Sequence, residues 1–90
     1  MANHDGQAHS SNVAAAIATE IRARRDGLAD DERRARRHPS SRQILTRRQR
    51  QMEAAFINGL LLALTHALGK PYDIGAAELL ISKGAIDGKA

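Results

Sequence analysis

The stretch LTRRQRQMEAAFINGLLLALTHALG, residues 45–69, begins as an arginine-rich polar segment and then becomes almost continuously apolar. Its internal glycine, Gly59, costs about 1 kcal/mol relative to alanine in a helix but does not forbid one. Gly69 is a suitable C-terminal cap, and Pro71 blocks continuation of the helix. Upstream, the tetrapeptide SSRQ at residues 40–43 has the serine and glutamine of a capping box. We therefore predict one helix of about 28 residues and about 40 Å, beginning near the second serine of that tetrapeptide.

The C-terminal half of this predicted helix is apolar on every side. Two stripes about 100° apart run along it: Phe56, Leu60, Ala63 and Ala67, and then Ile57, Leu61, Leu64 and Leu68. Each large apolar side chain left in water forfeits about 1.5–3 kcal/mol, and a chain this short buries only about 60–65% of its unfolded surface. We therefore expect a second chain, either another copy or a target protein, to cover part of the helix. The alternative is a monomer in which the first and last helices wrap the long helix completely.

The residues before this helix predict a first helical unit. Its candidate caps are Ser10, Ser11 and Asn12, and its apolar stripe is Val13, Ile17, Ile21 and Leu28. Gly27 interrupts the pattern, so the unit is either one helix or two. His38 precedes Pro39, which disfavours helical backbone at His38 and ends the unit.

A short last helix is predicted near the C-terminus, with Asp73 as its N-cap and Gly84 as its C-cap. No segment alternates with a period of two, so no strand is expected. The predicted fold class is all-α: a helical hairpin with one long helix in the C-terminal half, plus a short terminal helix. The predicted limits are a disordered tail over residues 1–11, a single helical domain over 12–84 and a frayed tail over 85–90.

Composition narrows the class of protein. The 90 residues include no cysteine, so a disulfide scaffold and a thiolate zinc site are excluded and nothing indicates an oxidising compartment. The N-terminal residues lack the basic and apolar regions of a signal peptide. The longest apolar stretch, residues 54–68, is shorter than the roughly 20 residues that span a bilayer. We expect a cytoplasmic protein without a membrane span.

No catalytic or cofactor-binding constellation is evident in the sequence. The histidines, which are His4, His9, His38 and His66, do not have metal-ligand spacing. Ser40 and Ser41 lack a convincing base, and no glycine-rich phosphate loop is present. The sequence therefore predicts a protein that is not an enzyme and has neither a metal nor a cofactor.

Charge is arranged in blocks along the chain, whose net charge is +4. Residues 26–32 hold four acids and no base, and residues 33–50 hold eight arginines and no acid. One interpretation is a solvated surface, partly neutralised by acid–arginine pairs four residues apart. The other is a small basic DNA-binding regulator whose arginines bind phosphates. The arginines of that alternative are Arg42, Arg47, Arg48 and Arg50.

Two segments carry a family resemblance. The first is EIRARRDGLADDERRARRHP, residues 20–39, and the second is residues 51–69, with a glutamate, a spaced apolar ladder and a final Leu-Gly. Both resemble the small quorum-sensing antiactivators of the rhizobial TraM type, which have an Ile-Arg-containing first helix ending at a proline. The Arg- and Ala-rich composition also suits a mobile element of a high-GC rhizobium, where a similar QseM-like protein acts.

The resemblance implies a homodimeric helical protein that sequesters a LuxR-type transcriptional activator, prevents it from binding DNA and so represses transcription and conjugative transfer. The link between the two helices is shorter than in that family, and the arginine run is more basic. The side chains expected to contact the partner or the second copy are Phe56, Ile57, Leu60, Leu61, Leu64 and Leu68. Asp30, Asp31 and Glu32 are expected to steer a basic target.

Overall fold

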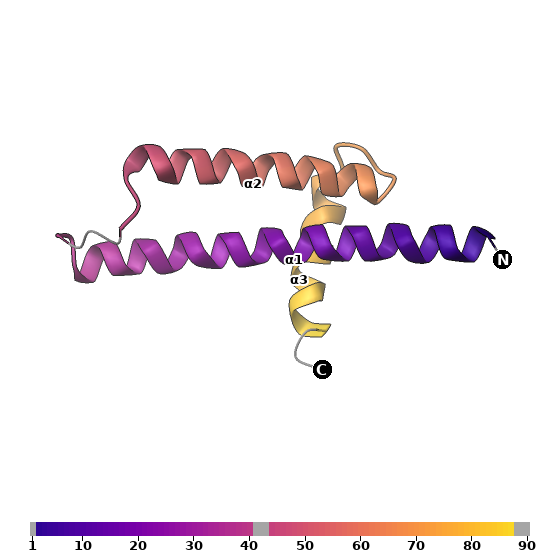
Figure 1. Cartoon of the computed structure of the whole chain (residues 1–90), viewed down its shortest axis with the longest axis horizontal. Helices are drawn as coiled ribbons and strands as arrows, with labels where there is room; N and C mark the ends of the chain where they lie inside the picture. The colour runs from indigo at the N-terminus through magenta and orange to yellow at the C-terminus, as the bar shows by residue number, and fades with distance from the viewer. Residues whose placement is uncertain (1, 41–43, 88–90) are drawn as a thin grey trace.

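The computed structural model describes residues 2–40 and 44–87, and it shows three helices and no strand within those ranges. Helix α1 spans Ala2–Arg37, α2 spans Arg47–Ala67 and α3 spans Ile74–Asp87. The first two helices run side by side in opposite directions, and α3 crosses them near the end where α2 finishes (Figure 1). The predicted all-α class, with a helical hairpin and a short terminal helix, is confirmed.

Helix α1 is one continuous helix of 36 residues, so Gly27 does not divide it. A side chain at Gly27 would meet nothing within 4 Å, and the residue therefore lies on an open surface of the helix. The helix also continues through residues 2–11, where a tail was expected, although side chains are described only from Asn12 onward. The predicted long helix in the C-terminal half is α2, with 21 residues, and α1 is longer than it, with 36.

Helix α2 has 21 residues and begins later than predicted, after an N-cap at Thr46. The Thr46 hydroxyl accepts from the Gln49 amide at 3.1 Å, and the Gln49 side chain accepts from the Thr46 amide at 2.8 Å. This is a capping box, but it lies six residues beyond the predicted one, whose residues 41–43 lie outside the described ranges. A contact with α1 favours the later start of α2. The buried Asp31 carboxylate accepts from the Leu45 amide at 2.9 Å, directly before the N-cap.

Gly69 ends α2 as predicted, with a φ of 74° that glycine adopts without strain. The Gly69 amide donates to the His66 carbonyl at 3.0 Å, and the Lys70 amide donates to the Thr65 carbonyl at 3.1 Å. These two bonds form a Schellman motif, which satisfies carbonyl groups at the end of the helix.

A tight turn connects α2 to α3. The Asp73 amide donates to the Lys70 carbonyl at 3.0 Å, and Tyr72 has a positive φ of 67°. A positive φ after a proline is typical of a type II turn. The Asp73 carboxylate accepts from the Ala76 amide at 3.0 Å, which confirms the predicted N-cap. The predicted end at Gly84 is wrong, since α3 continues to Asp87. Glycine is unfavourable within a helix but does not forbid one.

The core lies where α3 crosses the hairpin. Its buried apolar residues are Ala14, Ala18, Ile21, Ile57, Leu61, Leu64, Ala77 and Ile81. Helices α1 and α3 therefore cover one side of α2, whereas Phe56 and Leu62 on its other sides remain exposed. Complete wrapping of α2 within one chain, the alternative weighed from the sequence, is not what the structure shows. No described helix combines the length and apolar character that crossing a membrane requires.

Candidate interaction surfaces

A groove of about 340 Å³ lies along the exposed side of α2, next to α1. The residues that line it are Leu45, Gln49, Met52, Glu53 and Phe56, together with Arg24 from α1. The residues from α2 recur at intervals of three and four, which places them on one face of the helix. Met52 is 64% exposed and Phe56 is 50% exposed, so both present apolar surface to solvent. We call this surface the Phe56 groove.

Arg24 forms the wall of the Phe56 groove on the α1 side. Its guanidinium lies 4.3 Å from the centre of the Phe56 ring, a cation–π arrangement. It also donates to Glu53 on α2 and to Glu20 one turn earlier on α1, both at 2.7 Å. The hydrogen bonds to these two carboxylates, first that to Glu53, raise the pKa of Arg24. The Phe56 ring is thus held between the two helices and still has half of its surface exposed.

The apolar residues predicted to contact a partner fall into three groups. Phe56 is exposed and lines the groove, whereas Leu60 and Leu68 are partly buried against the core. Ile57, Leu61 and Leu64 are core residues packed with α1 and α3, and Leu64 is fully buried. These last three hold the hairpin together and face the interior of the chain. Sequence alone could not tell them from Phe56, because every side of this half-helix is apolar.

The three acids predicted to steer a partner have different environments. Asp30 and Glu32 are exposed and pair along α1 with Arg33 and Arg36, respectively. Asp31 is buried and faces α2, where it accepts from the Leu45 amide. Asp31 is therefore a structural residue that fixes the chain entering α2.

The second interaction of Asp31 is with an arginine of the predicted nucleic-acid set. Arg50 donates to the Asp31 carboxylate at 2.8 Å, and the Leu45 amide bond together with this pair lowers the pKa of Asp31. Arg50 therefore has a structural role, because its guanidinium group is bound to Asp31. Arg47 and Arg48 are exposed, and Arg42 lies outside the described residues.

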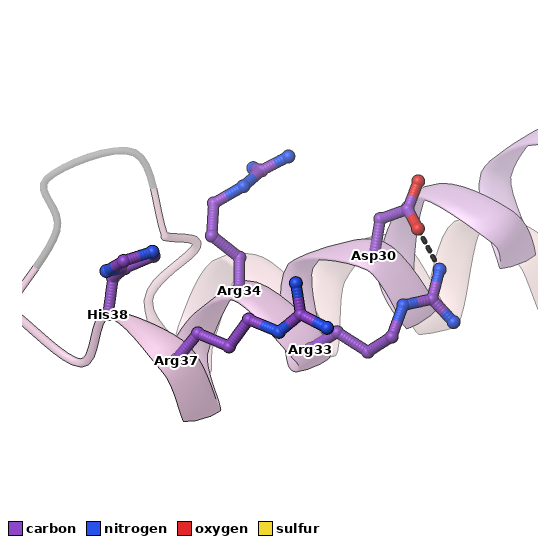
Figure 2. A pocket seen from close by; sticks show the side chains of 5 residues that line it. All are labelled: Asp30, Arg33, Arg34, Arg37 and His38. Atoms are coloured by element: carbon purple, nitrogen blue, oxygen red, sulfur yellow. Dashed lines mark hydrogen bonds and ion pairs between the residues drawn. The ribbon is translucent and has the colours of Figure 1, made fainter.

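A polar pocket of about 300 Å³ lies at the C-terminal end of α1 (Figure 2). Its lining residues are Asp30, Arg33, Arg34, Arg37 and His38. The figure shows Arg33 bonded to Asp30 at one end and His38 at the other, with Arg34 and Arg37 between them. We call it the Arg34 pocket. This site was not predicted from the sequence, although positions 30, 33, 34, 37 and 38 have the spacing of one helical face.

Further exposed apolar side chains lie on α3, on the turn before it and on the far side of α2. They are Leu62, Tyr72, Ile74 and Leu79, of which Leu79 is 69% exposed. The Tyr72 ring packs edge-on against His66, with ring centres 5.8 Å apart. His66 is therefore in contact with an aromatic ring at the end of α2.

Within the described residues, no three His, Cys, Asp or Glu side chains lie close enough together to hold a metal ion. Among the described residues that line them, neither the Phe56 groove nor the Arg34 pocket has a nucleophile beside a base. Both surfaces are suited to binding, one through apolar side chains and the other through positive charge.

Comparison with known proteins adds no relative: no family model, curated protein or solved structure matches the chain. Inferences about function consequently depend on the two surfaces and on the sequence resemblance given above.

Proposed function

We propose that the chain is a non-enzymatic protein-binding module, an antiactivator that sequesters a LuxR-type transcriptional activator and prevents it from binding DNA. The observation that carries this proposal is the Phe56 groove, where Met52 and Phe56 stay exposed although the hairpin has already formed its core. Exposed apolar side chains beside polar ones are typical of a protein-binding surface.

The composition of the groove supports binding of another protein. An aromatic ring, a methionine and an arginine meet there, and these residue types are enriched at protein interfaces. Arg24 is already held by Glu20 and Glu53, so little side-chain entropy is lost when a partner covers it. Phe56 is likewise restrained by Arg24. A preorganised anchor of this kind binds more tightly than a mobile one.

The class of partner comes from the resemblance to TraM-type antiactivators. The surface that would contact this partner is limited to exposed side chains, because several of the predicted contact residues are buried. Ile57, Leu61 and Leu64 stabilise the chain itself, so contact is assigned to Phe56, Met52 and Arg24. Of the acids, Asp30 and Glu32 are exposed but paired with arginines, which weakens their attraction for a basic partner. Apolar contact is therefore the main source of affinity in this proposal.

A gel-shift experiment tests the proposal with a LuxR-type activator from the same genome and its promoter DNA. Adding the wild-type chain should remove the activator–DNA complex. Phe56→Asp should weaken this inhibition by about 30-fold or more, as expected when a central aromatic anchor is lost. Leu79→Asp is the matched control, because Leu79 is also an exposed apolar residue, 69% exposed against 50% for Phe56, but lies on α3. This variant should inhibit like the wild type.

Circular dichroism and light scattering accompany this experiment, so that folding and oligomeric state are known for each variant. A folded Phe56→Asp variant that still inhibits would exclude the groove as the contact surface. Loss of inhibition only in the Leu79→Asp variant would move the contact to α3. If the wild-type chain leaves the activator on its DNA, the proposed function itself is wrong.

A second candidate function, a small basic DNA-binding regulator, is favoured by the exposure of Arg47 and Arg48 at the start of α2. Their guanidinium groups are open to phosphates, whereas Arg50 is bound to Asp31. Gel shifts of the isolated chain with duplex DNA over a range of salt concentrations separate the two functions, since phosphate contacts weaken steeply with salt. No retardation at low salt excludes this candidate.

A further inference from the structure

We propose that the Arg34 pocket is a binding site for a short polyphosphate, such as pyrophosphate or the phosphate chain of a nucleotide. The pocket is independent of the Phe56 groove and shares no lining residue with it. The two guanidinium groups of Arg34 and Arg37 supply the charge, while Arg33 and His38 form its two ends.

The spacing of the lining residues favours a chain of phosphates over a single phosphate. Positions 30 to 38 span roughly 12 Å of helix, and the side chains at intervals of three and four lie one above another along α1. Each planar guanidinium can bind a phosphate through two parallel N–H groups. Arg34 and Arg37, three positions apart, can therefore contact adjacent phosphates of one linear ligand.

The balance of charge in the pocket leaves a net attraction for anions. Arg33 is neutralised by Asp30, which also holds its guanidinium in place. Among the described side chains, no carboxylate forms an ion pair with Arg34 or Arg37. The C-terminus of a helix contributes roughly half a negative charge, which opposes an anion. Two guanidinium charges exceed that contribution.

The chemistry of the pocket places the recognition on phosphates and not on a base. Among the described residues that line it, none is Phe, Tyr or Trp and none has an apolar side chain. Stacking of a nucleobase on an aromatic ring is the usual source of base affinity. A volume of about 300 Å³ is also at the small end of ligand pockets. The base of a nucleotide would therefore remain outside.

Isothermal titration calorimetry of the full chain with pyrophosphate tests the site, at an ionic strength of about 0.15 M, where the screening length is about 8 Å. The double substitution Arg34→Gln with Arg37→Gln should weaken binding by about tenfold or more, because two close charge–charge contacts are lost. The control is Arg47→Gln with Arg48→Gln, which removes the same charge from exposed helical positions outside the pocket. This control should bind pyrophosphate within about twofold of the wild type, because neither Arg47 nor Arg48 is among the residues that line the pocket.

Three further ligands identify what the site recognises. ATP should bind at least as tightly as pyrophosphate, and adenosine should not bind. Inorganic phosphate should bind more weakly than pyrophosphate, since it can engage only one guanidinium at a time. Glutamine is compatible with a helix, and circular dichroism checks that both double variants remain folded.

Several outcomes would overturn this site. One is that pyrophosphate fails to bind the wild-type chain, and another is that it binds the Arg34/Arg37 variant with unchanged affinity. An equal loss in both double variants would mean a diffuse basic surface instead of a pocket. Adenosine binding as tightly as ATP would show that the phosphates are not what is recognised. None of these results bears on the Phe56 groove, so the two proposals fail separately.

Discussion

The two ends of the hairpin of α1 and α2 are held together by different chemistry. Where α3 crosses, the contact is apolar, with Ile21, Leu64 and Ile81 packed in the core. At the other end, where the chain passes from α1 to α2 (Figure 1), the contact is polar, because the buried Asp31 carboxylate is bound to Arg50 and to the Leu45 amide. The first end therefore depends on packing and the second on charge.

This difference determines how each end responds to change. Apolar packing is insensitive to pH and to moderate salt, but each lost methylene group leaves a cavity. A buried ionised carboxylate is stabilised only while it is paired, and its attraction for the partner charge is lost when it is protonated. Truncation of apolar side chains should therefore act mainly on the first end, and acidification mainly on the second.

The largest expected effect is at the apolar end, from Leu64→Ala. Leu64 of α2 is fully buried in the core that α2 forms with α1 and α3. Truncation of this side chain should therefore lower the free energy of unfolding by about 2–5 kcal/mol. Urea denaturation followed by circular dichroism measures the change. Leu62→Ala is the control on the same helix, because Leu62 is 40% exposed, and it should lower stability by less than about 1 kcal/mol. Equal losses in the two variants would contradict the placement of the core.

A smaller effect is expected at the polar end, from Asp31→Asn. The asparagine can still accept from the Leu45 amide but no longer balances the charge of Arg50. Hydrogen exchange should report faster opening of the first turn of α2. The neighbouring substitution Asp30→Asn removes an exposed pair with Arg33 and should leave that turn unchanged.

The pH dependence of stability gives a second measurement at this end. The Leu45 amide and Arg50 lower the pKa of Asp31 in the folded chain. Its contribution is therefore complete above the unfolded value of about 3.9 and is lost as pH falls through the lower folded value. Stability of the wild type should fall more steeply below about pH 4 than that of Asp31→Asn. Parallel profiles for the two proteins would exclude this role of Asp31.

Much of the fold could be predicted from sequence because its signals are local. The helical class, the glycine cap at Gly69 and the N-cap at Asp73 each depend on a few neighbouring residues, and the structure confirms all three. The start of α2 could not be predicted in the same way. The sequence contains two possible capping boxes for this helix. The Asp31 carboxylate of α1 accepts from the Leu45 amide, directly before the second capping box, and so favours the later start.

The candidate surfaces were less accessible to sequence analysis. Phe56 and Leu64 lie on the same apolar half-helix, and only the positions of α1 and α3 make one exposed and the other buried. Arg24 could not be assigned to the groove, because its contact with Glu53 joins residues 29 positions apart. The residues of the Arg34 pocket do have a helical spacing, but the sequence predicted only a partly neutralised surface or a set of DNA-binding arginines, of which none lines this pocket. Long-range ion pairs carry no local signal.

The smallest expected effect concerns such a long-range pair, Arg25 with Glu78, at the apolar end. Arg25 donates two bonds to Glu78, at 2.6 and 2.7 Å, and thereby lowers the pKa of Glu78. Both side chains are more than a third exposed, so water screens the pair and Glu78→Gln should lower stability by less than about 1 kcal/mol. The loss should disappear in about 1 M salt, where the screening length is about 3 Å. Glu20→Gln is the control, because its pair with Arg24 lies within one helix. A loss of several kcal/mol on Glu78→Gln alone that persists in about 1 M salt would contradict a water-screened pair.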